Sequence, residues 1–142
     1  MNTEKIVNEK RQPALKVAEV SGSALIAQFM NCTTVDKNWP YRVNDNLWKL
    51  EGLKYDKSWD WLMPVIEKIE KLEVKGYEED KEFIQQFTVE ISNEQCVIHR
   101  DFAPQYWGTE TDFLELYDCN NMSKIESTFT AIVKFIEWFN TI

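Results

Sequence analysis

The sequence predicts an α+β fold, in which an antiparallel sheet is packed by two main helices and a short N-terminal helix. Residues 58–72 and 123–140 carry apolar side chains at helical spacing, and residues 83–100 alternate as a strand hairpin does. A chain of 142 residues can close one hydrophobic core without disulfides or a metal. We therefore expect a polar tail or short helix at 1–22 and a single sandwich domain at 23–142.

The first main helix is expected to begin near Trp59, because Ser58 is a residue type that caps helix N-termini. Its buried stripe consists of apolar residues spaced three or four apart: Leu62, Val65, Ile66, Ile69 and Leu72. Pro64 lacks an amide proton, so we expect either a separate first turn or a kink there. A shorter helix is expected at 23–30, after Gly22 interrupts the preceding helical pattern.

The sheet is predicted from alternation of apolar and polar residues. Phe87, Val89 and Ile91 alternate with polar residues, which is typical of a strand with one buried face. Turn residues at 92–95 are followed by 96–100, which we predict to be the returning antiparallel strand with polar residues at its end. A further strand is expected at 113–117, and short strands at 41–43 and 48–50. The charged segment 73–81 is expected to be a connection.

The last helix is predicted from Ser123 and Glu126, which have the spacing of a capping box. Its expected buried face is Ile125, Phe129, Ile132, Val133, Ile136 and Phe139. Phe135 and Trp138 widen the apolar surface beyond one stripe. Burial by another element or by a second subunit is therefore expected, and a homo-oligomer is predicted.

Composition excludes several classes of protein. Sixteen basic and twenty-four acidic residues give a net charge of −8, which disfavours binding to nucleic acid and to anionic membranes. No apolar run approaches the roughly 20 residues that cross a bilayer, and the polar N-terminus does not resemble a signal peptide. Three widely spaced cysteines favour reduced thiols. A cytoplasmic location is expected.

No catalytic or metal-binding motif is recognisable. One histidine and no C-x-x-C exclude a structural zinc site, and the four glycines form no phosphate-binding loop. Cys96 and His99 lie three residues apart on one predicted strand, so they would point to opposite faces. Acidic residues are abundant, but without ordered spacing they predict solvated surface more often than catalysis. We predict no catalytic residue, no metal and no cofactor.

Aromatic residues concentrate in the predicted loops and at the start of the middle helix. About half of them are expected to be core, by ordinary burial statistics, and the rest to be partly exposed, where polar-tipped rings often line clefts. Rings beside an arginine suit a nucleobase and its phosphate, through stacking and charge-assisted hydrogen bonds. His99 with Arg100 either forms ordinary strand-end hydrogen bonds or grips a phosphate. The candidate ligand-binding residues are Trp39, Tyr41, Arg42, Trp59, Trp61, His99, Arg100, Tyr106 and Trp107.

Four segments carry a resemblance to a known group of proteins: SALIAQFM, YDKSWDWLMPVIEKIEKL, FTVEISNEQCVI and SKIESTFTAIVKFIEWFN. They cover about half the chain, and SWDWLMPVIEKIE is the specific part. In them the chain resembles small α-β-α sandwich domains of phages, prophages and Bacteroidetes genomes. The resemblance implies helices against an antiparallel sheet in a phage-encoded protein of the host cytoplasm, with no catalytic residues to transfer.

The preferred hypothesis is a non-enzymatic protein that sequesters a small anionic nucleotide signal of host immunity, as sponge-like counter-defence proteins do. The aromatic loops and the missing catalytic motifs favour it. The alternative is an acidic interaction module that inhibits a host defence protein, which net charge favours. A hydrolase of a signal nucleotide is the third hypothesis, and it would depend on carboxylates.

Overall fold

The computed structural model describes residues 22–78, 81–93, 95–103, 111–118 and 122–142. The chain divides into two compact units, Met1–Leu53 and Lys54–Ile142, and each is described by itself. The boundary between the units falls inside residues 23–142, which were expected to form one domain. That expectation stays a prediction. The α+β class is confirmed, because helices accompany a two-stranded and a four-stranded antiparallel sheet. No helix among the described residues is long and apolar enough to cross a membrane.

The first unit contains helix α2 (Gly22–Phe29) and a short hairpin of β1 (Tyr41–Val43) and β2 (Asn46–Trp48). Helix α2 ends at Phe29, and Asn31 follows with a φ of 59°, which allows the amide of Cys32 to bond the carbonyl of Ala27. Asn44 and Asp45 have positive φ and form the two-residue turn, as a right-twisted hairpin requires. A 3-10 turn, η2 (Leu50–Gly52), follows.

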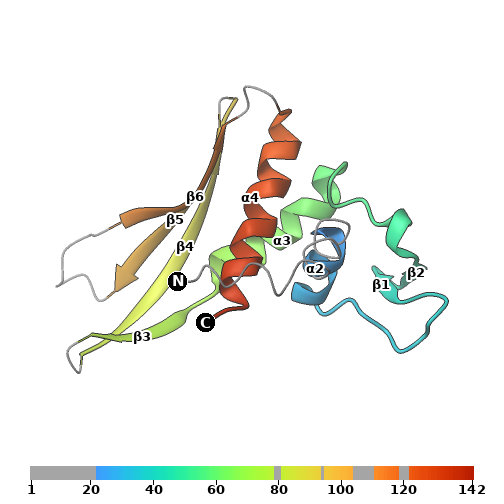
Figure 1. The fold of residues 1–142 in the computed structure, drawn as a ribbon, viewed down its shortest axis with the longest axis horizontal. Helices are drawn as coiled ribbons and strands as arrows, with labels where there is room; N and C mark the ends of the chain where they lie inside the picture. The colour runs from blue at the N-terminus through green and yellow to red at the C-terminus, as the bar shows by residue number, and fades with distance from the viewer. Residues whose placement is uncertain (1–21, 79–80, 94, 104–110, 119–121) are drawn as a thin grey trace, which may run out of the picture. The chain divides into compact units, whose positions relative to one another are not determined.

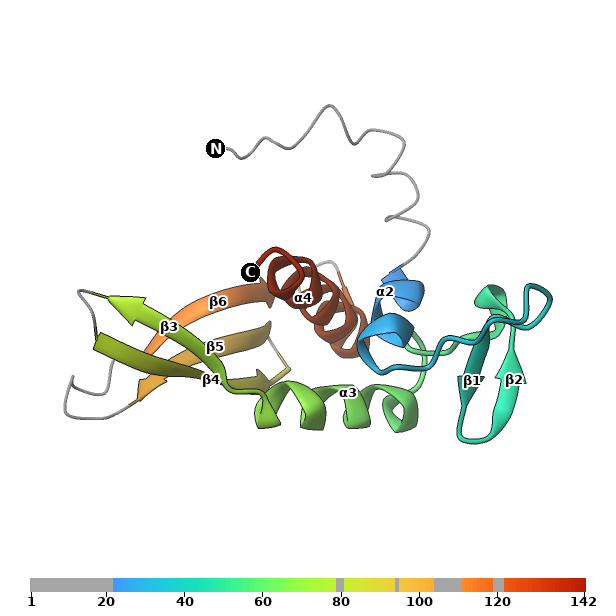
Figure 2. The ribbon, with the colours of Figure 1, turned by 90° about the horizontal axis from the view of Figure 1, so that it is seen from below.

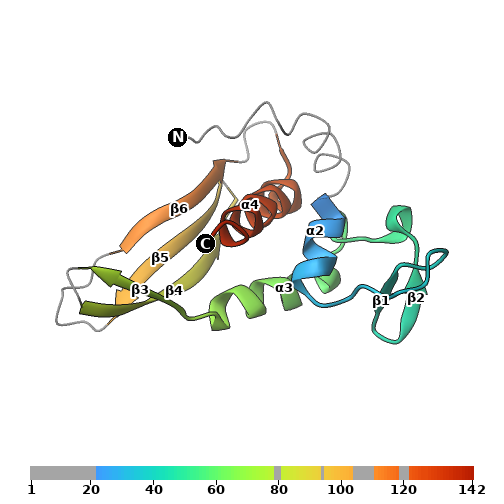
Figure 3. The same cartoon turned by 60° about the horizontal axis from the view of Figure 1, so that its bottom comes forward.

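The second unit is a four-stranded antiparallel sheet with two helices (Figure 1). The strands are β3 (Val74–Glu78), β4 (Lys81–Ile91), β5 (Gln95–Ala103) and β6 (Thr111–Asp118), in that spatial order. Helices α3 (Trp59–Lys71) and α4 (Lys124–Phe139) lie on the same side of the sheet, α3 against β4 and α4 against β5 and β6 (Figure 3). This agrees with the predicted sheet packed by two main helices.

The prediction that residues 73–81 form a charged connection is wrong, because they contain strand β3. Figure 2 shows α3 leading directly into this strand at one edge of the sheet. Val74 pairs with Gln85 and Gly76 with Phe83. Lysine, glycine and glutamate have low strand propensity, so local sequence does not predict β3, and pairing with β4 provides the hydrogen bonds.

Strand β4 is longer than β3, and its residues 86–91 have no strand beside them on that side among the described residues. Helix α3 occupies part of this edge. A Glu70 oxygen accepts a hydrogen bond from the backbone N–H of Val89 at 3.0 Å. A Glu73 oxygen accepts from the side-chain amide of Gln86 at 3.2 Å. The Glu70 carboxylate therefore occupies a backbone donor of an edge that is otherwise open to strand pairing.

Helix α3 buries four of the five residues of the predicted stripe, Leu62, Val65, Ile66 and Ile69. The fifth, Leu72, is at the C-cap and is only half-buried. Ser58 is at the N-cap position, but its hydroxyl makes no capping hydrogen bond, contrary to expectation. The helix continues through Pro64 as one element. Of the two outcomes expected at this proline, a separate first turn is therefore wrong.

The buried face of α4 differs from the expected one. Its buried residues are Ser127, Thr128, Ala131, Ile132, Phe135 and Ile136. Phe129 and Val133 are only half-buried, whereas Phe135 is completely buried in this unit. The hydroxyls of Ser127 and Thr128 donate to the carbonyl of Lys124, so both residues can face the core without an unmade hydrogen bond. The buried face of α4 is therefore rotated about the helix axis relative to the face predicted from apolar residues alone.

The capping box of α4 is confirmed, and it makes a prediction about pH. Ser123 N–H donates to the Glu126 carboxylate, and Glu126 N–H donates to the Ser123 hydroxyl. Hydrogen bonds to the carboxylate, first from the Ser123 backbone N–H and then from the Ser123 side chain, lower the pKa of Glu126. A carboxyl with a lower pKa in the folded state stabilises the protein above its unfolded pKa, and this contribution is lost as pH falls through the folded value. Urea unfolding of Glu126→Gln should therefore show a weaker loss of stability below about pH 4.5 than the parent protein. Identical pH profiles would contradict this prediction.

Candidate functional site

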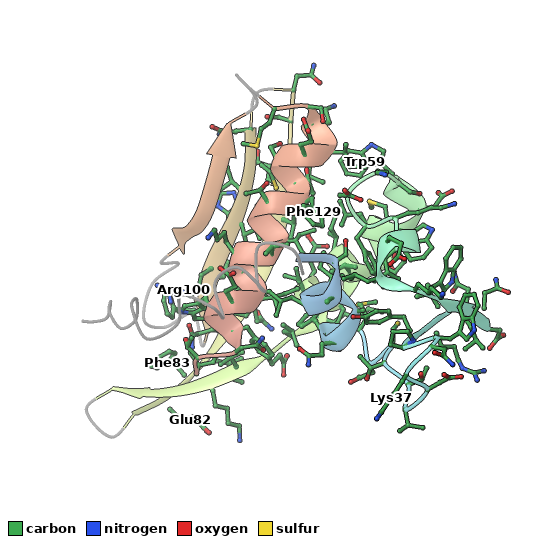
Figure 4. The ribbon with its side chains drawn as sticks, turned by 45° about the vertical axis from the view of Figure 1, so that its right-hand side comes forward. Lys37, Trp59, Glu82, Phe83, Arg100 and Phe129 are labelled. Atoms are coloured by element: carbon green, nitrogen blue, oxygen red, sulfur yellow. The ribbon has the colours of Figure 1, made fainter. Side chains whose placement is uncertain are left out.

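The nine predicted ligand-binding residues do not gather at one place among the described residues. Trp39, Tyr41 and Arg42 belong to the first unit, at the start of the hairpin. In the second unit, Figure 4 shows Trp59 at the first turn of α3, away from Arg100 beside the C-terminal end of α4. Tyr106 and Trp107 lie outside the described residues.

His99 and Arg100 point to opposite faces of β5, because successive residues of a strand alternate. The ring nitrogen Nε2 of His99 lies 2.7 Å from a carboxylate oxygen of Glu90, on the face away from the helices. Arg100 pairs in register with Phe87, whose ring packs on α4. The two residues therefore do not grip one phosphate together.

Arg100 is the centre of an aromatic group on the helix-covered face. Its guanidinium carbon lies 5.3 Å from the ring centre of Phe102 and 5.9 Å from that of Trp138. Its Nη1 donates to the Gln85 side-chain oxygen at 3.4 Å, a long hydrogen bond. The rings of Phe83 and Phe102 meet edge to face at 5.6 Å. We call these five residues, Phe83, Gln85, Arg100, Phe102 and Trp138, the Arg100 cluster.

Strand register and one glycine position this cluster. Phe83 and Gln85 lie on the same face of β4 as Phe87, whose ring packs on α4. Phe102 pairs with Gln85 and Gly76 pairs with Phe83, so these residues share the face that the helices cover. A Cβ on Gly76 would lie 2.4 Å from the Phe83 ring, so the ring covers the bare backbone of this glycine. Trp138 comes from the last turn of α4 and also packs edge to face on Phe87.

The members of the cluster other than Arg100 were missing from the predicted site. Phe83 is near the start of β4 and Phe102 near the end of β5, and only the register of the hairpin brings these two parts of the sequence together. Two features of the sequence pointed to this cluster. Phe83 is four residues from Phe87 and so lies on the same face of the strand, and Trp138 widens the apolar face of the last helix.

All five members are half-buried, so the cluster is partly open to solvent. Arginine presents five donors in a flat fork that matches carboxylate and phosphate oxygens, and its neighbouring rings offer faces for stacking. The arrangement can hold an anion next to a flat ring. A purely structural contact between sheet and helix would use the same geometry, and is worth about 0.5–2 kcal/mol for a cation over a ring.

The start of α3 is less suited to a ligand. The Trp61 ring meets the buried Tyr55 ring edge to face at 5.1 Å. Trp59 and Trp61 are both half-buried. Trp61 therefore serves packing of its own unit, as the core interpretation of the aromatic residues expects.

In the first unit, aromatic and basic residues share the exposed face of the hairpin. Arg42 pairs with Leu47, and Lys49 follows on the same face by alternation. The Lys49 ammonium lies 5.1 Å from the ring centre of Trp39. We call Trp39, Arg42, Leu47 and Lys49 the hairpin face. Tyr41 lies on the other side of the hairpin, opposite Trp48.

Chemistry outside these two groups is sparse in the described parts of the chain. Cys32 is half-buried and Cys96 is buried, and neither forms a disulfide. Within the same ranges, no three metal-ligating side chains gather in a geometry that could hold an ion. Comparisons with known protein families, with curated proteins and with solved structures give no match to this chain.

Proposed function

We propose that this chain is a non-enzymatic binding protein for a small anionic ligand with a flat ring, of the nucleotide class. The observation that carries the proposal is Arg100, a half-buried residue whose guanidinium carbon lies within 6 Å of the Phe102 and Trp138 ring centres. In such surroundings water competes less for the guanidinium than at an open surface. A ligand phosphate would bind the guanidinium while its base stacks on an aromatic ring.

The same chemistry favours binding over catalysis. Arginine stays protonated at any physiological pH, and phenylalanine and tryptophan rings exchange no protons. These groups bind and orient a ligand but supply neither a general base nor a nucleophile. In the phage setting that the sequence resemblance implies, the protein would act in the host cytoplasm by sequestering a nucleotide immune signal.

Calorimetry of the full chain with cyclic dinucleotides and ADP-ribose derivatives tests this function. The parent protein should bind one member of the panel, and heat release should return the ligand intact. Arg100→Lys should weaken binding at least about tenfold, because a lysine cannot form the bidentate fork. Trp138→Leu should weaken it as well, through the lost stacking face.

Arg42→Lys is the matched control, because it makes the same chemical change on the hairpin face. It should bind like the parent, and near-UV circular dichroism should show that all variants are folded. Unchanged binding by Arg100→Lys would exclude the cluster as the site. Recovery of a cleaved nucleotide would instead favour the hydrolase hypothesis.

A second candidate, an acidic module that inhibits a host defence protein, has one specific observation in its favour. Residues 54–142 contain nine basic and eighteen acidic residues, so the negative charge of the chain is concentrated in the second unit. A dense negative field suits a basic partner surface. Pull-down from host lysate with the parent protein tests it, and the absence of a stoichiometric partner would argue against it.

A further inference from the structure

The side of strand β4 that faces away from β5 is open over residues 86–91, where no described strand pairs with it. In an antiparallel ladder, successive residues point their backbone groups to opposite sides of the strand. The Ser92 amide bonds the Gln95 carbonyl across the turn, so Ser92 points its amide toward β5. By this alternation, the residues whose amides and carbonyls point outward are Phe87, Val89 and Ile91.

One of these outward amides is bonded within the same copy of the chain. Glu70, in the last turn of α3, accepts the hydrogen bond of the Val89 N–H at 3.0 Å. Glu70 is exposed and Val89 half-buried, so the bond lies where solvent reaches the edge of the sheet. The acceptor is a carboxylate, which makes the bond stronger than one to a neutral oxygen. Through this side chain, α3 supplies the acceptor that a further strand would bring.

The open segment is suited to pairing with itself. Four of its six residues are of types that favour strands. Two copies can pair antiparallel about a two-fold axis with Val89 opposite Val89. Phe87 would then lie opposite Ile91 on one face, and Thr88 would lie opposite Glu90 on the other. Apolar residues would meet apolar residues and no like charges would be opposed, so a second copy supplies a matching strand.

We infer that Glu70 protects the open edge of β4 against strand pairing with another copy of the chain. In the paired arrangement, each Val89 amide would donate to the Val89 carbonyl of the other copy. The amide has one proton, so pairing has to break the bond to Glu70 in both copies. This inference is independent of ligand binding at the Arg100 cluster.

Sedimentation velocity of the full chain over a range of concentrations provides the first test. Glu70→Ala should associate further than the parent as concentration rises, because its Val89 amide is open to another strand. Glu70→Gln should sediment like the parent, since its side-chain oxygen can still accept the hydrogen bond. The matched control is Glu67→Ala, which removes the same charge from an exposed glutamate one turn earlier in α3. It should also sediment like the parent.

Hydrogen exchange of single amides, followed by NMR, tests the protection directly. In dilute Glu70→Ala, the Val89 amide should exchange at least about tenfold faster than in the parent, because its charged acceptor is lost. Raising the concentration should slow this exchange again in Glu70→Ala alone, as the edges of two copies pair. In Glu67→Ala, the Val89 amide should exchange at the parent rate.

A second substitution shows whether the association uses this edge. Thr88→Glu, added to Glu70→Ala, would place a glutamate opposite Glu90 of the other copy and should restore the parent sedimentation. Thr88 is exposed, and circular dichroism should show that every variant is folded. Parent-like sedimentation of Glu70→Ala at every concentration would overturn the inference, as would an unchanged exchange rate at Val89. Association that persists after Thr88→Glu would also overturn it, because the contact would then lie elsewhere.

Discussion

Replacing Phe135 by alanine is expected to lower the free energy of unfolding by about 3–5 kcal/mol, as for other fully buried aromatic residues. The Phe135 side chain is completely buried. It meets the Phe87 ring edge to face at 5.0 Å and stacks on Phe139 at 6.2 Å. Truncation removes one of the contacts through which α4 packs on the sheet and leaves a cavity that its rigid neighbours cannot fill.

Urea unfolding followed by circular dichroism measures this loss. Phe135→Leu should lose less, because leucine fills part of the space. The matched control is Met63→Ala in α3, where a large apolar side chain is 44% exposed, and its stability should change by no more than about 0.5 kcal/mol. A loss below about 1 kcal/mol in Phe135→Ala would show that this residue is not at the centre of the core.

Gly76→Ala is expected to destabilise the protein by about 1–3 kcal/mol. At most positions the same replacement stabilises a protein, because alanine lowers the conformational entropy of the unfolded chain. The added methyl would lie within 3.0 Å of three atoms of the Phe83 ring. The ring must move, and its edge-to-face contact with Phe102 is then lost. Because Phe102 lies beside the Arg100 guanidinium, the variant should also weaken ligand binding at the Arg100 cluster.

A double-mutant cycle separates the steric effect from the backbone effect. In a Phe83→Ala background no ring opposes the methyl, so Gly76→Ala should be neutral or should stabilise by up to about 1 kcal/mol. The reversal of sign is the informative result. If Gly76→Ala destabilises equally in both backgrounds, the ring does not explain why glycine occupies this position.

Local patterns predicted several elements well, since their causes act over a few residues. The capping box of Ser123 and Glu126 satisfies amides of its own helix, and the spacing of Leu62, Val65 and Ile69 follows from the helical repeat. The hairpin of β4 and β5 was visible in alternation around a four-residue turn. Strand β3 was missed because its stability comes from pairing and not from its own residues.

The candidate site, too, was predicted only as far as local sequence allows. Arg100 was found because an arginine next to the only histidine stands out in the sequence, although His99 then proved to lie on the opposite face. Its actual neighbours were not identified, because Phe102 and Trp138 come from different elements. Trp39 and Arg42 were selected as loop aromatics and a nearby cation, and the hairpin added Leu47 and Lys49 beside them.

The sequence by itself determined the fold class, the two main helices and the central hairpin, because helical and strand periods are local properties of the chain. Only the tertiary structure decided which face of α4 is buried, since the hydroxyls of Ser127 and Thr128 are satisfied within the helix and can turn inward. It also decided that the rings of Phe102 and Trp138 lie beside one guanidinium, with the Phe83 ring against Phe102. Strand register and helix packing bring such residues together, and neither is a property of any single segment.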